Sequence, residues 1–87
     1  MAEILKIRVM EHNRADQIRI GRECPITSLE CTVKNVVAQY EEKNAWCGGF
    51  LNACKEYYMR VAIVDADTLE ILHMIYDERA GNQINNL

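Results

Sequence analysis

The chain lacks the sequence motifs that identify most enzymes. Its 87 residues contain no glycine-rich phosphate loop, zinc-protease helix, nucleophile elbow or dinucleotide-binding fingerprint. A domain of this size buries only about 60–65% of the surface that its unfolded chain exposes, so a large enclosed substrate pocket is not expected. We therefore predict a non-enzymatic protein without a cofactor. It should form one domain over residues 1–80, followed by a frayed, Asn-rich tail at residues 81–87.

Long apolar runs are also missing. No stretch approaches the length of a membrane span, and the N-terminal residues alternate charged with aliphatic side chains instead of forming the apolar core of a signal peptide. We expect an intracellular, cytoplasmic protein with reduced thiols and no membrane association. The net charge of -3 weakly disfavours nonspecific binding to polyanions, but it leaves room for a local basic patch.

The usual spacing of metal ligands is absent, although the chain has four cysteines. They form two pairs of equal spacing, Cys24 with Cys31 and Cys47 with Cys54. Seven residues of continuous helix rise about 10.5 Å, beyond the ~7 Å reach of a disulfide, and zinc sites commonly use more closely spaced cysteines. A bridge between Cys47 and Cys54 would need the intervening glycines to break the helix. We predict free thiols, with Cys31 accessible, no metal site and no catalytic Cys/His pair.

A hairpin is expected at the start of the fold. Alternation of charged and aliphatic residues predicts strands at residues 4–10 and 17–22, joined by a polar loop. Pro25 should end this strand pairing because it has no N–H group to donate. The inward side chains of the hairpin would be Leu5, Ile7, Val9, Ile18 and Ile20.

The middle of the chain has a helical pattern. Thr27 and Glu30 match a capping box at its start. An apolar stripe at helical spacing continues to residue 40, and the helix should end near residue 43 or 44. Gly48 and Gly49 then predict a turn, followed by a second, short helix at residues 50–57.

A second hairpin is expected in the last third of the chain. Strands at residues 59–64 and 69–76 would pair with Val64 opposite Leu69. This register assigns one apolar set to the core: Met59, Val61, Ile63, Leu72 and Met74. It assigns a second set to the other face: Arg60, Ala62, Val64, Leu69, Ile71, His73 and Ile75. The predicted fold class is α+β, with the order ββααββ and an antiparallel sheet.

The second face of the last hairpin is too apolar to face solvent, so something should cover it. The cover would be the short helix with Trp46 and Phe50, a protein partner, or a second copy of the chain in a homodimer. The acidic side of the central helix offers further contacts. The predicted partner-binding residues are Glu41, Glu42, Val64, Leu69, Ile71, His73 and Ile75.

The outward side of the first hairpin is basic, which offers an alternative function. The phosphates of a nucleic acid would be contacted by Lys6, Arg8, Arg19 and Arg60. Sheet surfaces that bind RNA also present aromatic side chains for base stacking, and only Tyr58 is placed to do so. Nucleic-acid binding is therefore the alternative to protein binding.

A compact, acidic, one-domain protein with a strand-rich scaffold and no catalytic residues resembles the small phage-encoded inhibitors of bacterial defence, such as anti-CRISPR proteins. The resemblance is one of class and assigns no role to any residue. It implies that the protein blocks a host nuclease complex in the host cytoplasm, by steric occlusion or by nucleic-acid mimicry. Because the first hairpin is basic, occlusion fits better than mimicry. We expect a protein-binding inhibitor or adaptor.

Overall fold

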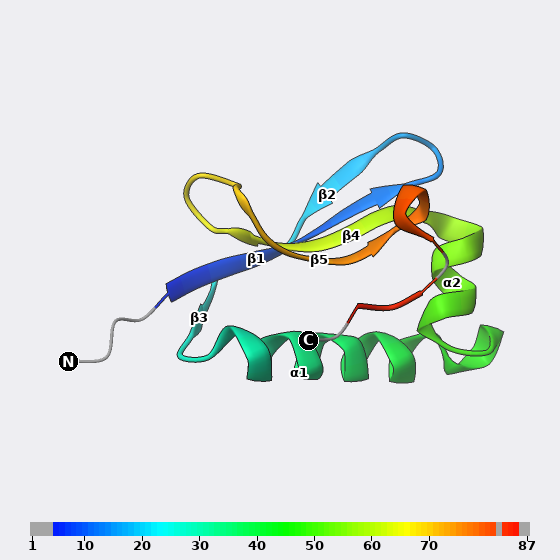
Figure 1. Ribbon diagram of the computed structural model, residues 1–87, viewed down its shortest axis with the longest axis horizontal. Coiled ribbons are helices and arrows are strands. Elements are labelled where there is room, and N and C mark those ends of the chain that lie inside the picture. The colour runs from blue at the N-terminus through cyan, green and yellow to red at the C-terminus, as the bar shows by residue number, and fades with distance from the viewer. Residues whose placement is uncertain (1–4, 82, 86–87) are drawn as a thin grey trace.

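The computed structural model describes residues 5–81 and 83–85 and has an α+β fold, as predicted (Figure 1). The predicted start of the first strand at Ile4, and residues 82, 86 and 87 of the predicted tail, lie outside the described residues. The elements are, in order, β1 (Leu5–Asn13), β2 (Ile18–Ile20), β3 (Cys24–Ile26), α1 (Leu29–Lys43), the 3-10 helix η1 (Ala45–Cys47), α2 (Phe50–Tyr57), β4 (Tyr58–Asp65), β5 (Ile71–Asp77) and the 3-10 helix η2 (Glu78–Ala80).

All five described strands belong to one antiparallel sheet. The strand order is β2-β1-β4-β5, so the two predicted hairpins join through the pairing of β1 with β4. Strand β3 pairs with β1 on the same side as β2. Helix α1 runs beneath one face of the sheet, and α2 lies at one end of it (Figure 1).

Strand β3 is an addition to the predicted order ββααββ. Pro25 was expected to end the strand pairing, but it lies within β3, opposite Lys6. Strand β3 pairs with β1 alone, and an edge strand tolerates proline because its missing N–H group can face away from the neighbouring strand.

The helical middle matches the predicted boundaries closely. The N-cap is Ser28 rather than Thr27, and its hydroxyl oxygen accepts a hydrogen bond from the Cys31 N–H at 3.2 Å. The chain then turns at Gly48 and Gly49, where φ is 99° and 111°. These left-handed angles favour glycine, so the glycine pair separates the two helices.

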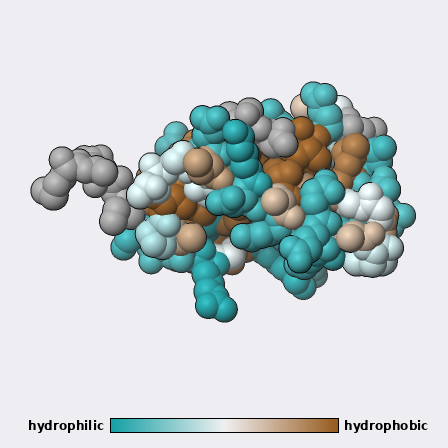
Figure 2. Space-filling model, turned by 90° about the horizontal axis from the view of Figure 1, so that it is seen from below, coloured by the Kyte–Doolittle hydropathy of each residue, from teal (hydrophilic) through white to brown (hydrophobic). Residues whose placement is uncertain are grey.

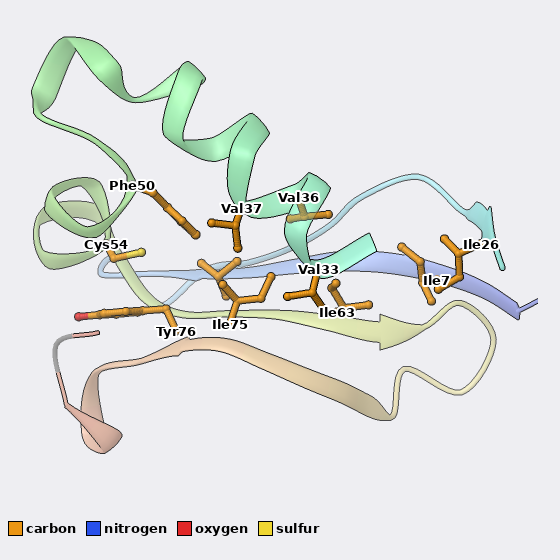
Figure 3. Packing of buried hydrophobic residues seen from close by; sticks show 11 residues of the cluster. Ile7, Ile26, Val33, Val36, Val37, Phe50, Cys54, Ile63, Ile75 and Tyr76 are labelled. Carbon is orange, nitrogen blue, oxygen red and sulfur yellow. The ribbon is translucent and has the colours of Figure 1, made fainter. Parts of the chain in front are cut away.

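The main core lies between the two helices and the sheet (Figure 3). Helix α1 contributes three valines, and the Phe50 ring of α2 stacks on Tyr40 with a centroid distance of 4.8 Å. The buried members of this core are Ile7, Ile26, Val33, Val36, Val37, Phe50, Cys54, Val61, Ile63, Ile75 and Tyr76. The core fixes the sheet's position relative to the helices and leaves its other face outside.

The register of the last hairpin differs from the predicted one. Val64 pairs with Ile71, not with Leu69, and the pairing shifts twice along β5. These bulges leave Leu72 and Ile75 without a directly opposite partner on β4. Simple alternation therefore fails in this strand.

The shifted register moves three residues, His73, Met74 and Ile75, to the face opposite the expected one. Ile75, which we expected on the second face, is fully buried in the main core. Met74, which we expected in the core, lies opposite Ala62 and packs in a separate apolar cluster. These expectations were wrong because alternation in the sequence does not reveal a bulge.

The end of the described chain contacts the rest of the protein. Ile84 packs against the main core, and the Asn85 N–H donates to the Ile75 carbonyl at 2.8 Å. The His73 Nε2 lies 2.7 Å from the Asn85 carbonyl and donates to it. These contacts attach the chain beyond η2 to the outer edge of β5.

Candidate interaction surface

The sheet has two unlike faces. In the part of the chain that the structure describes, α1 and α2 pack on one face, and the other carries only the short helix η2 at one end (Figure 1). We call this second side the open face. Side chains of directly opposite residues share a face, so the strand pairing assigns residues to it. The open face comprises Lys6, Arg8, Met10, His12, Ile18, Ile20, Arg60, Ala62, Val64, Ile71, Met74 and Asp77.

An apolar strip crosses the centre of the open face. Ile20 pairs with Met10, Met10 with Ala62, and Ala62 with Met74, so four apolar side chains span the sheet. Val64 lies in the next row, opposite Arg8. Ala62 and Val64 are fully buried and form a small cluster with Met10 and Met74. The centre of the strip is closed by the longer side chains around it.

The ends of the strip are exposed. On the β2 side, Ile18 is 55% exposed and Ile20 is 40% exposed. On the β5 side, Leu69 is 48% exposed and Ile71 is 43% exposed. Ile20 ends the strip itself, and Ile18 and Ile71 lie in the rows on either side of it. Leu69 lies in the turn between β4 and β5.

The predicted intramolecular cover does not exist over this face. Phe50 points into the main core on the other side of the sheet, and Trp46 is 73% exposed in η1 (Figure 3). The Trp46 ring instead lies beside the Tyr57 ring, with centroids 6.3 Å apart. Within the described residues, neither Trp46 nor Phe50 covers the open face.

The predicted partner-binding residues divide among three places. Leu69 and Ile71 are exposed beside the open face, and Val64 is buried within it. His73 lies opposite Ile63, on the helix side. Ile75 belongs to the main core, as described above. The sequence therefore identified only part of this surface.

The two predicted acidic contacts belong to another surface. Glu41 and Glu42 are exposed on α1, on the helix side of the sheet. Figure 2 shows the molecule from that side, where hydrophilic side chains separate several apolar areas. Neither glutamate can therefore contact a partner that sits only on the open face.

The exposed residues of β2 were misassigned to the core. Ile18 and Ile20 were expected to point inward, but they lie opposite His12 and Met10 on the open face. Alternation in β2 correctly places Arg19 on the opposite face from these isoleucines. It does not reveal which of the two faces a helix covers, and no signal within this short segment does.

The predicted basic patch is divided between the two faces. Arg19 lies opposite Glu11, whose carboxylate accepts a hydrogen bond from the Tyr40 hydroxyl of α1. Arg19 is therefore on the helix side, away from the open-face cations. Among those, Lys6 forms an ion pair with Glu23 at 3.8 Å. A continuous basic surface of the predicted kind does not form.

Arg60 is bound within the protein. Its Nε donates to His12 Nδ1 at 3.3 Å, and His12 Nε2 lies 2.7 Å from an Asp16 carboxylate oxygen. Because Nδ1 accepts from Arg60, we assign the imidazole proton to Nε2, which donates to Asp16. The pair of Asp16 and His12 thus orients the Arg60 side chain.

The four cysteines are free thiols, and Cys31 is exposed as predicted. Cys24 is exposed as well, although we expected Cys31 to be the one accessible thiol. Cys24 and Cys31 line a groove of about 490 Å³ between β3 and α1. Cys54 is fully buried, and burial raises the pKa of its thiol to about 12. Within residues 5–81 and 83–85, no three His, Cys, Asp or Glu side chains gather in a way that could hold a metal ion.

Comparisons with protein-family models, curated proteins and solved structures found no match to this chain. Among the described residues, no helix is long and apolar enough to cross a membrane. Function must therefore be argued from the surface itself.

Proposed function

We propose that the protein is a non-enzymatic protein-binding module that acts as an inhibitor or adaptor through its open face. The observation that supports this is the pair of exposed apolar ends on an otherwise closed strip. Large apolar side chains that gather on one side of a small domain are typical of a binding surface. Within the described residues, no element covers them: Ile18, Ile20, Leu69 and Ile71.

The binding free energy that these apolar side chains can supply is limited. Fully burying a large aliphatic side chain contributes about 1.5–3 kcal/mol, and these four are about half-exposed before binding. Their further burial would contribute roughly 3–6 kcal/mol. Association itself costs about 4–15 kcal/mol in lost motion. The partner must therefore also make polar contacts or cover a wider area of the open face.

A sheet face suits inhibition by occlusion. Its backbone is fixed by hydrogen bonds to neighbouring strands on both sides of β1 and β4, so little order is lost when a partner binds. The resemblance to small phage-encoded inhibitors implies such a mechanism, with the inhibitor covering a working surface of its target. The nucleic-acid alternative has less support, because Arg19 lies on the other face and Arg60 is held by His12.

Quantitative affinity capture tests this proposal. Wild-type protein and the variants Ile20→Asp and Ile71→Asp would be immobilised and exposed to a lysate of the cells in which the chain is naturally expressed, which are the host cells if a phage encodes it. Leu5→Asp is the matched control, because Leu5 is 39% exposed but lies on the helix side, opposite Ile26. We expect both open-face variants to lose the captured proteins and the control to retain them. Circular dichroism would confirm that each variant is folded, and unchanged capture by both open-face variants would refute the proposal.

A further inference from the structure

Arg8 is a fixed cation on the open face whose charge no carboxylate neutralises. Its Nε donates to the Ala66 carbonyl at 3.1 Å, and its Nη1 donates to the Gly21 carbonyl at 3.0 Å. Both acceptors are neutral backbone groups. Within residues 5–81 and 83–85, no carboxylate oxygen lies within the 4.0 Å ion-pair distance of Arg8.

The other cations near the sheet differ from Arg8. Lys6 pairs with Glu23, and Arg14 pairs with Glu78 at 2.7 Å. Arg60 binds His12 and lies opposite Asp77. Arg60, like Arg8, is held by a neutral acceptor, but it has the Asp77 carboxylate opposite it in the sheet, whereas the row of Arg8 contains Val64 and Ile71 and no carboxylate.

The geometry of Arg8 leaves capacity for a ligand. A guanidinium has five N–H donors, and the two carbonyls use two of them. The carbonyls come from the β4–β5 turn and from the link between β2 and β3, so they hold the side chain from two sides. A guanidinium that is already fixed loses little freedom when it binds an anion, which favours affinity.

Apolar side chains lie on one side of Arg8, and the ion pair of Lys6 with Glu23 lies on the other. Arg8 lies directly opposite Val64, which pairs in turn with Ile71. The neighbouring row contains Met10 and Ile20. An ion pair formed here is partly shielded from water, and charge-assisted hydrogen bonds are stronger in such a place than on an open surface. A ligand that complements this region would carry one anionic group flanked by apolar groups.

Resting on the proposed function, we infer that the open face recognises a protein segment in which an Asp or Glu side chain, flanked by apolar residues, pairs with the Arg8 guanidinium. A nucleic acid presents closely spaced phosphates and is bound by several free cations together. Among the described cations of the open face, Lys6 is paired with Glu23 and Arg60 lies opposite Asp77. Arg8 lies beside apolar side chains, with no carboxylate in its row. That combination fits a protein carboxylate.

Selection from a displayed library of random peptides tests the inference. We expect the peptides recovered on wild-type protein to contain Asp or Glu beside aliphatic residues. Replacing that acid with Gln or Asn in a synthetic copy should weaken binding about ten- to a hundredfold, as expected for a hydrogen bond between charged groups. This arm leaves the protein unchanged, so its folding does not affect the result. Recovery of peptides without an acidic preference would overturn the inference.

Substitution of the arginine provides the second arm. Arg8→Gln keeps an amide donor but removes the charge, and it should bind the selected acidic peptide about ten- to a hundredfold more weakly than wild type. Arg19→Gln is the matched control, because it removes the same charge from the helix side of the sheet. Equal affinity of Arg8→Gln and wild type would contradict the inference. So would binding of a DNA oligonucleotide, or of a second copy of the chain, that depends on Arg8 while no acidic peptide binds.

The two proposals can fail separately. If Ile20→Asp and Ile71→Asp lose capture while Arg8→Gln captures fully, the open face is a binding surface but the inferred pairing of an acidic residue with Arg8 is refuted. Unchanged capture by all three variants would refute both proposals.

Discussion

Replacing Ile75 with alanine tests the arrangement of β5 that defines the open face. Ile75 is fully buried in the main core, whereas Ile71 is 43% exposed at the end of the apolar strip. Truncating a buried isoleucine to alanine costs about 2–5 kcal/mol, because it removes apolar contacts and leaves a cavity. The same change at Ile71 should cost about 1 kcal/mol, because much of that side chain already contacts water.

The predicted difference in the free energy of unfolding is large enough to measure by urea unfolding monitored with circular dichroism. A loss of about 3 kcal/mol in a domain of this size corresponds to a fall in Tm of roughly 12–24 °C. Met74→Ala provides an informative control, since Met74 is only partly buried and packs in the small cluster of the open face. It should cost less than Ile75→Ala. If Ile71→Ala or Met74→Ala destabilises the protein more than Ile75→Ala, the bulged register is wrong and the open face must be redrawn.

Three further predictions concern thiols and backbone geometry. In the folded protein, Ellman's reagent should react quickly with exposed Cys24 and Cys31 and reach buried Cys54 only after unfolding; four equally reactive native thiols would contradict the described core. Burial raises the pKa of Cys54 from 9.0 to about 12, so the stability that its protonated thiol contributes is complete below pH 9 and is lost as the pH rises toward 12. Urea titrations should therefore show that the free energy of unfolding falls less at alkaline pH for Cys54→Ala than for wild type. Identical falls would refute this assignment. Gly49→Ala should cost about 1 kcal/mol or more, because φ is 111° and the added carbon would lie 2.9 Å from a Glu41 oxygen. Gly21→Ala should cost less in the same unfolding assay, because its added carbon would come no closer than 3.4 Å to a neighbouring atom.

The helices could be predicted from the sequence because their signals are local. The apolar stripe of α1 repeats at helical spacing, and the pair Gly48 and Gly49 marks the break before α2. Both signals depend on residues within a few positions of one another. The predicted limits of α2, residues 50–57, are therefore confirmed.

The arrangement of the strands could be predicted only in part. In β5 nearly every residue is apolar, so alternation cannot locate the bulges that turn Ile75 into the core. In β2 the alternation is clear, but the face that α1 covers is decided by distant contacts, and Ile18 and Ile20 were assigned to the wrong side. Four of the five described strands were found and β3 was missed, and the surface that the strands form required the structure.

The anchor at Arg8 shows a further limit of sequence reasoning. The residue was selected as a phosphate contact because it is basic and faces outward. Its two carbonyl partners belong to Gly21 and Ala66, which are distant in the sequence, so its fixed position could not be foreseen. The same contacts change its expected role from one member of a basic patch to a single cation in an apolar strip.

The most direct test of the open face as a binding surface is the affinity capture of one set of proteins by Ile20→Asp and by Leu5→Asp. The two positions are almost equally exposed in the free protein, at 40% and 39%, but lie on opposite faces of the sheet. We predict that Ile20→Asp loses the captured partner while Leu5→Asp retains it. Retention by Ile20→Asp, or loss by Leu5→Asp alone, would contradict the account.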